Sequence, residues 1–128
     1  MLYAILCYHR EAEVSGWTQE EDAAVMTAHA ADLEKIAKRG RLGPVARLMP
    51  TTTAVTLKPG RDPLVLDGPF AETKEQLLGF YVVDCDTLEQ VIETARPFAH
   101  EGGMLEIRPV MYFQQATPDV VRTGSRSQ

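Results

Sequence analysis

Apolar side chains fill nearly every position of two separate stretches, residues 2–8 and 77–85. Runs of this length, rich in Leu, Val, Tyr and Phe, are typical of β-strands that are buried on both faces. Residues 104–113 show a different pattern, because apolar residues alternate there with polar or charged ones such as Glu106 and Arg108. This alternation predicts a third strand with one face toward the core.

Two other stretches have helical spacing. Residues 18–39 carry one apolar stripe, formed by Val25, His29, Leu33 and Ile36. Thr18 and Glu21 have the spacing of a capping box, and Gly40 is a natural helix stop, so residues 18–39 are predicted to be helical. A second helix is predicted after a further capping box at residues 86–89, with an apolar side formed by Leu88, Val91, Ile92, Ala95 and Phe98.

Two prolines and a β-prone segment complete the picture. Pro97 is expected to bend or end the second helix, and Pro109 implies an edge strand or a bulge. Residues 51–57 are strongly β-prone, and residues 63–66 read as a short returning strand after a turn, so this region predicts a hairpin.

The predicted order is strand, helix, hairpin region, strand, helix, strand. This order fits the ferredoxin-like split βαβ plan with an extra hairpin, in the α+β class. Residues 1–116 are predicted to form one domain, and the polar residues 117–128 a mobile tail.

A mismatch between helices and strands leads to a prediction about assembly. Two amphipathic helices cover one face of a sheet, yet residues 2–8 and 77–85 are apolar on both faces. The second face would be a larger apolar patch than a monomer normally exposes. We therefore expect a homodimer in which two sheets stack face to face.

Composition narrows the classes of function. The chain has 128 residues and a net charge of −5, with thirteen Lys and Arg against eighteen Asp and Glu, which argues against a nucleic-acid surface. Neither a signal peptide nor an apolar run long enough for a membrane span is apparent, so we expect a cytoplasmic protein without membrane association. Cys7 and Cys85 lie far apart within apolar runs, which favours two buried thiols.

Histidines are the first candidates for chemistry. His29 lies on the apolar stripe of the predicted helix, where it is either a core histidine with a satisfied hydrogen bond or a general acid or base. His9 lies at the exit of the first strand and would join His29 if both line one pocket. Two histidines with Asp67 or Glu72 would be a metal site, but no local spacing signature supports one, so no metal or cofactor is predicted.

A second set of candidates surrounds the segment from Asp67 to Glu75. Asp67-Gly68-Pro69 predicts a tight turn, which Phe70 is expected to anchor against the core. The charged members of this set are Asp67, Glu72, Lys74 and Arg108. We expect them to bind substrate or to pair with one another. Trp17, Phe70, Phe80 and Tyr81 are candidate pocket walls or core residues.

The same segment carries a family resemblance. Asp67-Gly68-Pro69-Phe70 with Glu72, Lys74, Glu75 and Gly79-Phe80, together with residues 106–111, resembles the YCII-related proteins in their DGPF-motif branch. The resemblance covers residues 1 to 113 and implies a dimeric α+β barrel. It implies a site at His29, but His9 stands where smaller YCII proteins have an aspartate. It also implies lyase chemistry of the dehydrochlorinase type in some relatives, and association with extracytoplasmic-function sigma factors in others.

Two main hypotheses follow for function. The first is an enzyme with a small-molecule pocket and cofactor-independent acid–base chemistry, lyase-like or isomerase-like, in which His29 carries the proton and Arg108 or Lys74 anchors an anion. The second is a non-catalytic binding or regulatory accessory protein. A third alternative, in which Asp67 and Arg108 serve dimer assembly alone, stays open from the sequence.

Overall fold

A computed structural model describes residues 1–99 and 102–115 of the chain. The predicted tail, residues 117–128, lies outside the described residues. No helix among the described residues is long and apolar enough to cross a membrane.

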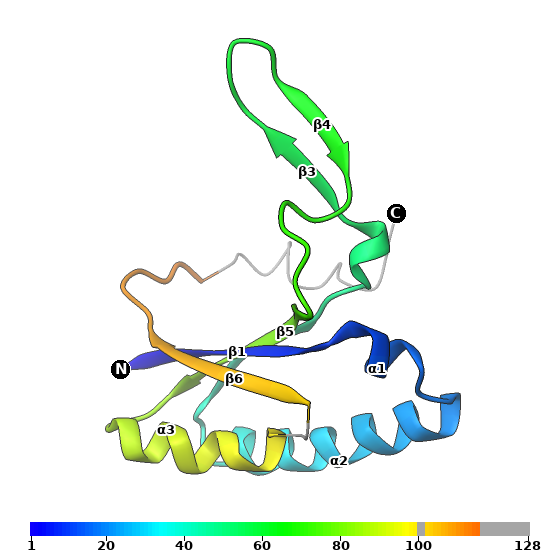
Figure 1. The fold of residues 1–128 in the computed structure, drawn as a ribbon. Helices are drawn as coiled ribbons and strands as arrows, with labels where there is room; N and C mark the ends of the chain where they lie inside the picture. The colour runs from blue at the N-terminus through cyan, green and yellow to red at the C-terminus, as the bar shows by residue number, and fades with distance from the viewer. Residues whose placement is uncertain (100–101, 116–128) are drawn as a thin grey trace.

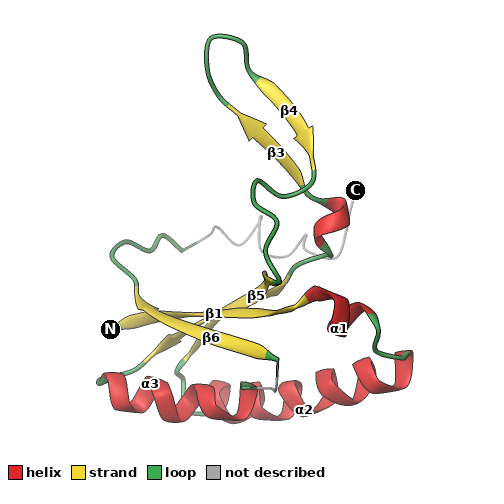
Figure 2. Ribbon diagram, viewed as in Figure 1, coloured by secondary structure: helices red, strands yellow, loops and turns green. Residues whose placement is uncertain are grey.

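The main sheet is antiparallel, with the strand order β2-β5-β1-β6. Its central strands are β5 (Glu75–Asp84) and β1 (Leu2–Arg10), and its edges are β2 (Leu42–Arg47) and β6 (Gly103–Pro109). The long helix α2 (Gln19–Lys38) follows β1, and α3 (Leu88–Ala95) follows β5. Figure 2 shows both helices on one side of the sheet. The predicted α+β class and ferredoxin-like plan are therefore confirmed.

Both helices begin at side-chain caps. The Thr18 hydroxyl accepts from the Glu21 amide at 3.0 Å, and the Glu21 carboxylate accepts from the Thr18 amide at 2.9 Å, which is the predicted capping box. For α3 the prediction was wrong by one residue. Thr87 is the cap and accepts from the Gln90 amide at 3.2 Å. Helix α3 gives way to the 3₁₀ turn η2 (Arg96–Phe98) at Pro97, as expected.

The second strand of the plan lies in a segment for which no strand was predicted. Residues 42–47 form β2 despite Pro44, because β2 is an edge strand with a register irregularity between Leu42 and Val45. The predicted strand at 51–57 begins only at Val55, after the 3₁₀ turn η1 (Thr51–Thr53). A short helix, α1 (Glu11–Ser15), was not predicted.

The last strand is shorter than predicted. It ends at Pro109, and residues 110–113 continue without strand structure. The predicted alternation of its side chains is nevertheless confirmed, since Leu105 and Ile107 pack against the core while Glu106 and Arg108 are exposed.

The hydrophobic core lies between the sheet and the two helices. The strands contribute Tyr3, Ile5, Tyr81 and Val83, and the helical segments contribute Ile36, Val91, Ala95 and Phe98. The other face of the sheet carries neighbours of these residues along each strand, including Ala4, Leu6, Phe80, Glu106 and Arg108. We call it the open face, because no described helix covers it (Figure 1).

A hairpin projects from this fold. Strands β3 (Val55–Lys58) and β4 (Leu64–Asp67) form a separate two-stranded antiparallel sheet, as the sequence predicted. The hairpin rises on the side of the main sheet opposite to α2 and α3 (Figure 1). It therefore lies on the same side as the open face.

Candidate functional site

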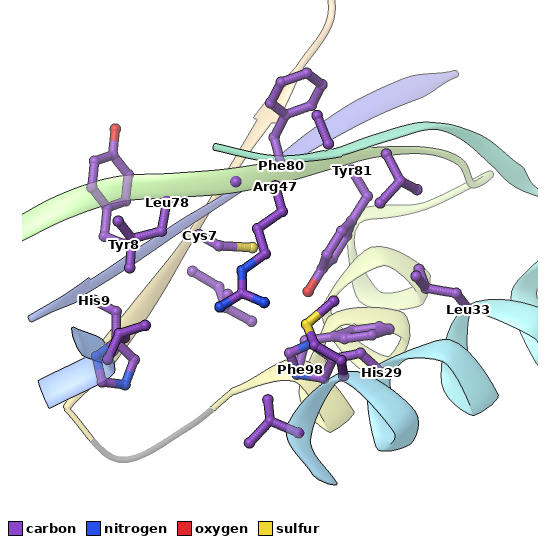
Figure 3. A pocket seen from close by; sticks show the side chains of 18 of the residues that line it. Cys7, Tyr8, His9, His29, Leu33, Arg47, Leu78, Phe80, Tyr81 and Phe98 are labelled. Atoms are coloured by element: carbon purple, nitrogen blue, oxygen red, sulfur yellow. The ribbon is translucent and has the colours of Figure 1, made fainter. Parts of the chain in front are cut away.

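A cavity of about 150 Å³ lies between the main sheet and the middle of α2. Its floor is formed by β1, β2, β5 and the start of β6, and its helical wall by α2 and η2. Most of its lining is apolar, including Val14, Val25, Leu33, Leu78 and Leu105. Polar side chains join them, including His9, His29, Cys7, Tyr8, Tyr81 and Arg47 (Figure 3).

His29 lies at the helical wall. Helix α2 brings it to the cavity because it shares the predicted stripe with Val25 and Leu33. Its ring meets the edge of Phe98, with centroids 5.3 Å apart, and Phe98 in turn packs on Tyr81 at 4.6 Å. The imidazole is therefore half-buried and fixed by an aromatic cluster instead of extending into solvent.

Tyr81 and Cys7 lie beside each other beneath this cluster. Burial raises the pKa of the Tyr81 hydroxyl well above its ordinary value, and the contact with Cys7 raises it further. Burial also raises the pKa of the Cys7 thiol. Both groups stay protonated near neutral pH, so they offer neutral donors, and Cys7 lacks the thiolate that a nucleophile needs.

His9 lies on the opposite side of the cavity, near Trp17. The two rings meet edge to face with centroids 5.9 Å apart. The His9 Nδ1 atom is 3.2 Å from the Arg10 carbonyl oxygen. A carbonyl only accepts hydrogen bonds, so this contact keeps a proton on Nδ1 and leaves Nε2 as the basic nitrogen of the neutral ring.

Arg47 is the only Lys or Arg among the described residues that line the cavity, and no Asp or Glu lines it. It is the last residue of β2, and Figure 3 shows its side chain extending toward the helical wall. The guanidinium donates to both carboxylate oxygens of Asp22 in the first turn of α2, at 2.6 and 3.2 Å. A cation therefore stands at the cavity, held by an ion pair at its rim.

Two comparisons with known proteins identify the family of the chain. The model of the YCII-related domain matches residues 1–114. The chain belongs to the YCII-related family. It is similar to an uncharacterized protein of Rhizobium meliloti strain 1021, with 48% identity over 118 residues. That match covers 89% of this YCII-related protein and 95% of its relative.

The remaining predicted site residues lie away from the cavity of the YCII-related protein. Asp67 ends β4, and Glu72 and Lys74 lie in the loop that follows. Arg108 lies on the open face of the sheet. All four side chains are exposed. Phe70 is 91% exposed, so the expectation that it anchors the turn against the core of its own chain was wrong. Within residues 1–99 and 102–115, no ion pair joins Arg108 to Asp67. The sequence-predicted set therefore separates into a cavity group (His9, His29, Trp17, Phe80 and Tyr81) and an exposed group (Asp67, Phe70, Glu72, Lys74 and Arg108).

No group of three or more His, Cys, Asp or Glu residues that could hold a metal occurs in the described part of the chain. Two cavity residues were missed by sequence reasoning. Arg47 lay in a segment for which no strand was predicted, and Cys7 was interpreted only as a small buried thiol. A prediction of an edge strand at residues 42–47 would have placed Arg47 at the end of the sheet, next to Asp22.

The ion pair at the rim predicts a pH dependence of stability. Arg47 holds the pKa of the Asp22 carboxyl below its ordinary value of about 3.9. A depressed folded-state pKa contributes stability that is present above the unfolded pKa and lost as the pH falls through the folded one. The Asp22→Asn variant should therefore lose less stability than the wild type as the pH falls below about 4. Urea denaturation at a series of pH values measures this, and parallel profiles for the two proteins would contradict it.

Proposed function

We propose that this YCII-related protein binds a compact, largely apolar anion in the cavity and performs cofactor-independent acid–base chemistry on it. His29 is the proton carrier and Arg47 binds the anionic group. The observation that supports this is the convergence of His9, His29 and Arg47 on one apolar cavity. We further propose that the protein works in the cytoplasm and belongs to the DGPF-motif branch.

The dimensions and lining of the cavity suggest the class of ligand. An apolar cavity of about 150 Å³ accommodates a molecule the size of benzene, so we expect one ring or a short branched chain. The apolar walls favour such a group, while the guanidinium favours a carboxylate by two charge-assisted hydrogen bonds. Asp22 forms an ion pair with Arg47 in the free protein. The ligand carboxylate therefore has to compete with the Asp22 carboxylate for the guanidinium.

The polar groups can divide the chemistry between them. A histidine with a pKa near working pH can take a proton from an acidic C–H bond and return it to another position, or assist departure of a leaving group. The basic Nε2 of His9 is a second acceptor on the other side of the cavity. Tyr81 stays protonated and can donate to the oxygen that gains negative charge. Proton abstraction is common to isomerase-like and lyase-like reactions.

A homodimer that stacks two open faces is part of this proposal. The central strands carry Leu6 and Phe80 on that face, and no described helix covers them. Sheet stacking would bury this apolar row and leave each cavity between its own sheet and its own helices.

A second candidate function is non-catalytic binding. The absence of Asp and Glu among the described lining residues favours it, because a histidine base is usually oriented by a carboxylate. In this alternative the protein is a ligand-responsive accessory protein, of the kind that the DGPF-branch resemblance associates with sigma factors.

Solvent hydrogen exchange distinguishes the two. The protein is incubated in D₂O with monocyclic and branched carboxylates and 2-oxo acids that carry an acidic C–H bond, and deuterium incorporation is followed by NMR. Catalysis predicts incorporation with the wild type and a fall of about 10²–10⁴-fold in His29→Gln. Thermal shifts are recorded in parallel for the same compounds.

A stabilising ligand without deuterium incorporation would favour the binding alternative. Compounds that shift the wild type and His29→Ala equally would contradict a site at His29. No shift and no incorporation with any compound would contradict the proposal as a whole.

A further inference from the structure

The projecting hairpin exposes an unusual amount of apolar surface. Its aliphatic side chains are between 47% and 69% exposed, and they are Val55, Leu57, Leu64, Val65 and Leu66. Strands β3 and β4 pack mainly on each other and form a sheet of their own. A two-stranded hairpin alone in water is marginally stable at best. The hairpin therefore lacks the apolar partner that its sequence is suited to.

Both faces of the hairpin share this character. Leu57 lies opposite Val65 in the register, and Val55 lies opposite Asp67 on the same face. Leu66 and Leu64 lie on the other face, opposite Thr56 and Lys58. Contiguous exposed aliphatic side chains mark sites of association, and native proteins usually cover such patches.

The base of the hairpin is fixed to the body. The Glu11 carboxylate on α1 accepts from the Thr51 amide at 2.6 Å and also from the Thr51 hydroxyl. At the other end, the Gly68 amide donates to the Ala54 carbonyl at 2.7 Å, and the Thr56 hydroxyl donates to the Gly68 carbonyl at 2.7 Å. Gly68 has a φ of +96°, which favours glycine. The Glu11–Thr51 contact ties the segment before β3 to α1, and the two Gly68 contacts close the base of the hairpin itself. An ordered base lowers the entropic cost of binding a partner.

We propose that hairpin β3–β4 is an arm that packs its exposed aliphatic side chains against a second copy of this chain. This inference rests on the homodimer proposed above and extends its interface beyond the sheets. The hairpin lies on the same side of the molecule as the open face (Figure 1). A second copy that is stacked on the open face by a two-fold axis must therefore lie beside the hairpin.

Symmetry favours a second copy over a different protein. In a two-fold assembly one operation brings both open faces and both hairpins against a partner at the same time. The three aliphatic residues of one hairpin face, Val55, Leu57 and Val65, offer on the order of 100 Å² each, so two arms add about 600 Å² to the area buried by the stacked sheets, where a specific interface needs about 1,000 Å² in total. A different partner would have to match the open face and the hairpin at once.

The test is the dimer dissociation constant of a hairpin variant. Leu57→Glu with Val65→Lys removes two exposed apolar side chains, and the opposite charges keep a favourable cross-strand pair. Sedimentation velocity over a dilution series should show a dimeric wild type and a variant whose dissociation constant is at least tenfold higher. The matched control Thr27→Glu with Ala31→Lys, at exposed positions of α2, should match the wild type.

The outcomes separate this inference from the proposed function. A hairpin variant that dimerises as tightly as the wild type would overturn the arm and leave the stacked sheets standing. A wild type that is monomeric at tens of micromolar would overturn both the arm and the dimer, while ligand binding in the cavity would be judged separately. A far-UV circular dichroism spectrum of the diluted, monomeric variant that matches the wild-type spectrum is the check that the body of the protein stays folded.

Discussion

The Phe98→Ala variant is expected to lose about 3–5 kcal/mol of unfolding free energy, the range for a buried aromatic side chain in a well-packed core. Phe98 is 2% exposed and contacts both His29 and Tyr81. Its removal leaves a void that joins the cavity and frees the imidazole from its aromatic neighbour. Urea denaturation followed by circular dichroism measures the loss.

The control for this prediction is Phe98→Leu, which keeps most of the volume but not the ring. It should cost clearly less than Phe98→Ala. If Phe98→Ala unfolds at the same urea concentration as the wild type, the aromatic cluster does not stabilise the helical wall of the cavity.

Replacement of Ile5 by alanine is expected to cost about 2–5 kcal/mol. Ile5 is completely buried in β1, between Tyr81 of β5 and Ile107 of β6. It lies on the helix-facing side of the sheet, where lost volume cannot be refilled without moving a strand. Since natural domains are stable by about 5–15 kcal/mol, the variant should be partly unfolded at moderate temperature.

Ile5→Val provides the matched comparison, with an expected loss of about 0.5–1.5 kcal/mol. Thermal denaturation of the three proteins should rank them as wild type, Ile5→Val and Ile5→Ala in falling order of midpoint. Equal midpoints for all three would mean that the centre of the core lies elsewhere.

The sequence predicted the elements whose signals are local and periodic. The apolar runs at β1 and β5 and the stripe of α2 depend on spacing alone, and so did the placement of His29 on the sheet side. Strand β2 was missed because Gly43-Pro44 resembles a break. Only the position of β2 at the sheet edge, a tertiary property, makes proline tolerable there.

The candidate site was predicted less completely for the same reason. The segment from Asp67 to Lys74 has the highest local density of charged and turn-forming residues, yet the hairpin carries it away from the cavity (Figure 1). Arg47 was overlooked because its partner, Asp22, is 25 residues earlier in the chain. No local pattern marks this pair, which forms only when β2 aligns beside β5.

Binding of a small carboxylate at Arg47 and His29 is the central claim, and the emission of Trp17 tests it most directly. Trp17 is the only tryptophan of the chain and lines the cavity, so its fluorescence reports on ligand there. A titration with benzoate compares the wild type with Arg47→Gln, Asp22→Asn and His29→Ala.

We predict a saturable change in Trp17 emission for the wild type. Affinity should fall about tenfold or more in Arg47→Gln, in line with the loss of a hydrogen bond to a charged group worth about 1.5–3 kcal/mol. It should rise in Asp22→Asn, where the competing carboxylate is gone, and should weaken in His29→Ala. A flat titration, or one affinity shared by all four proteins, would contradict the account.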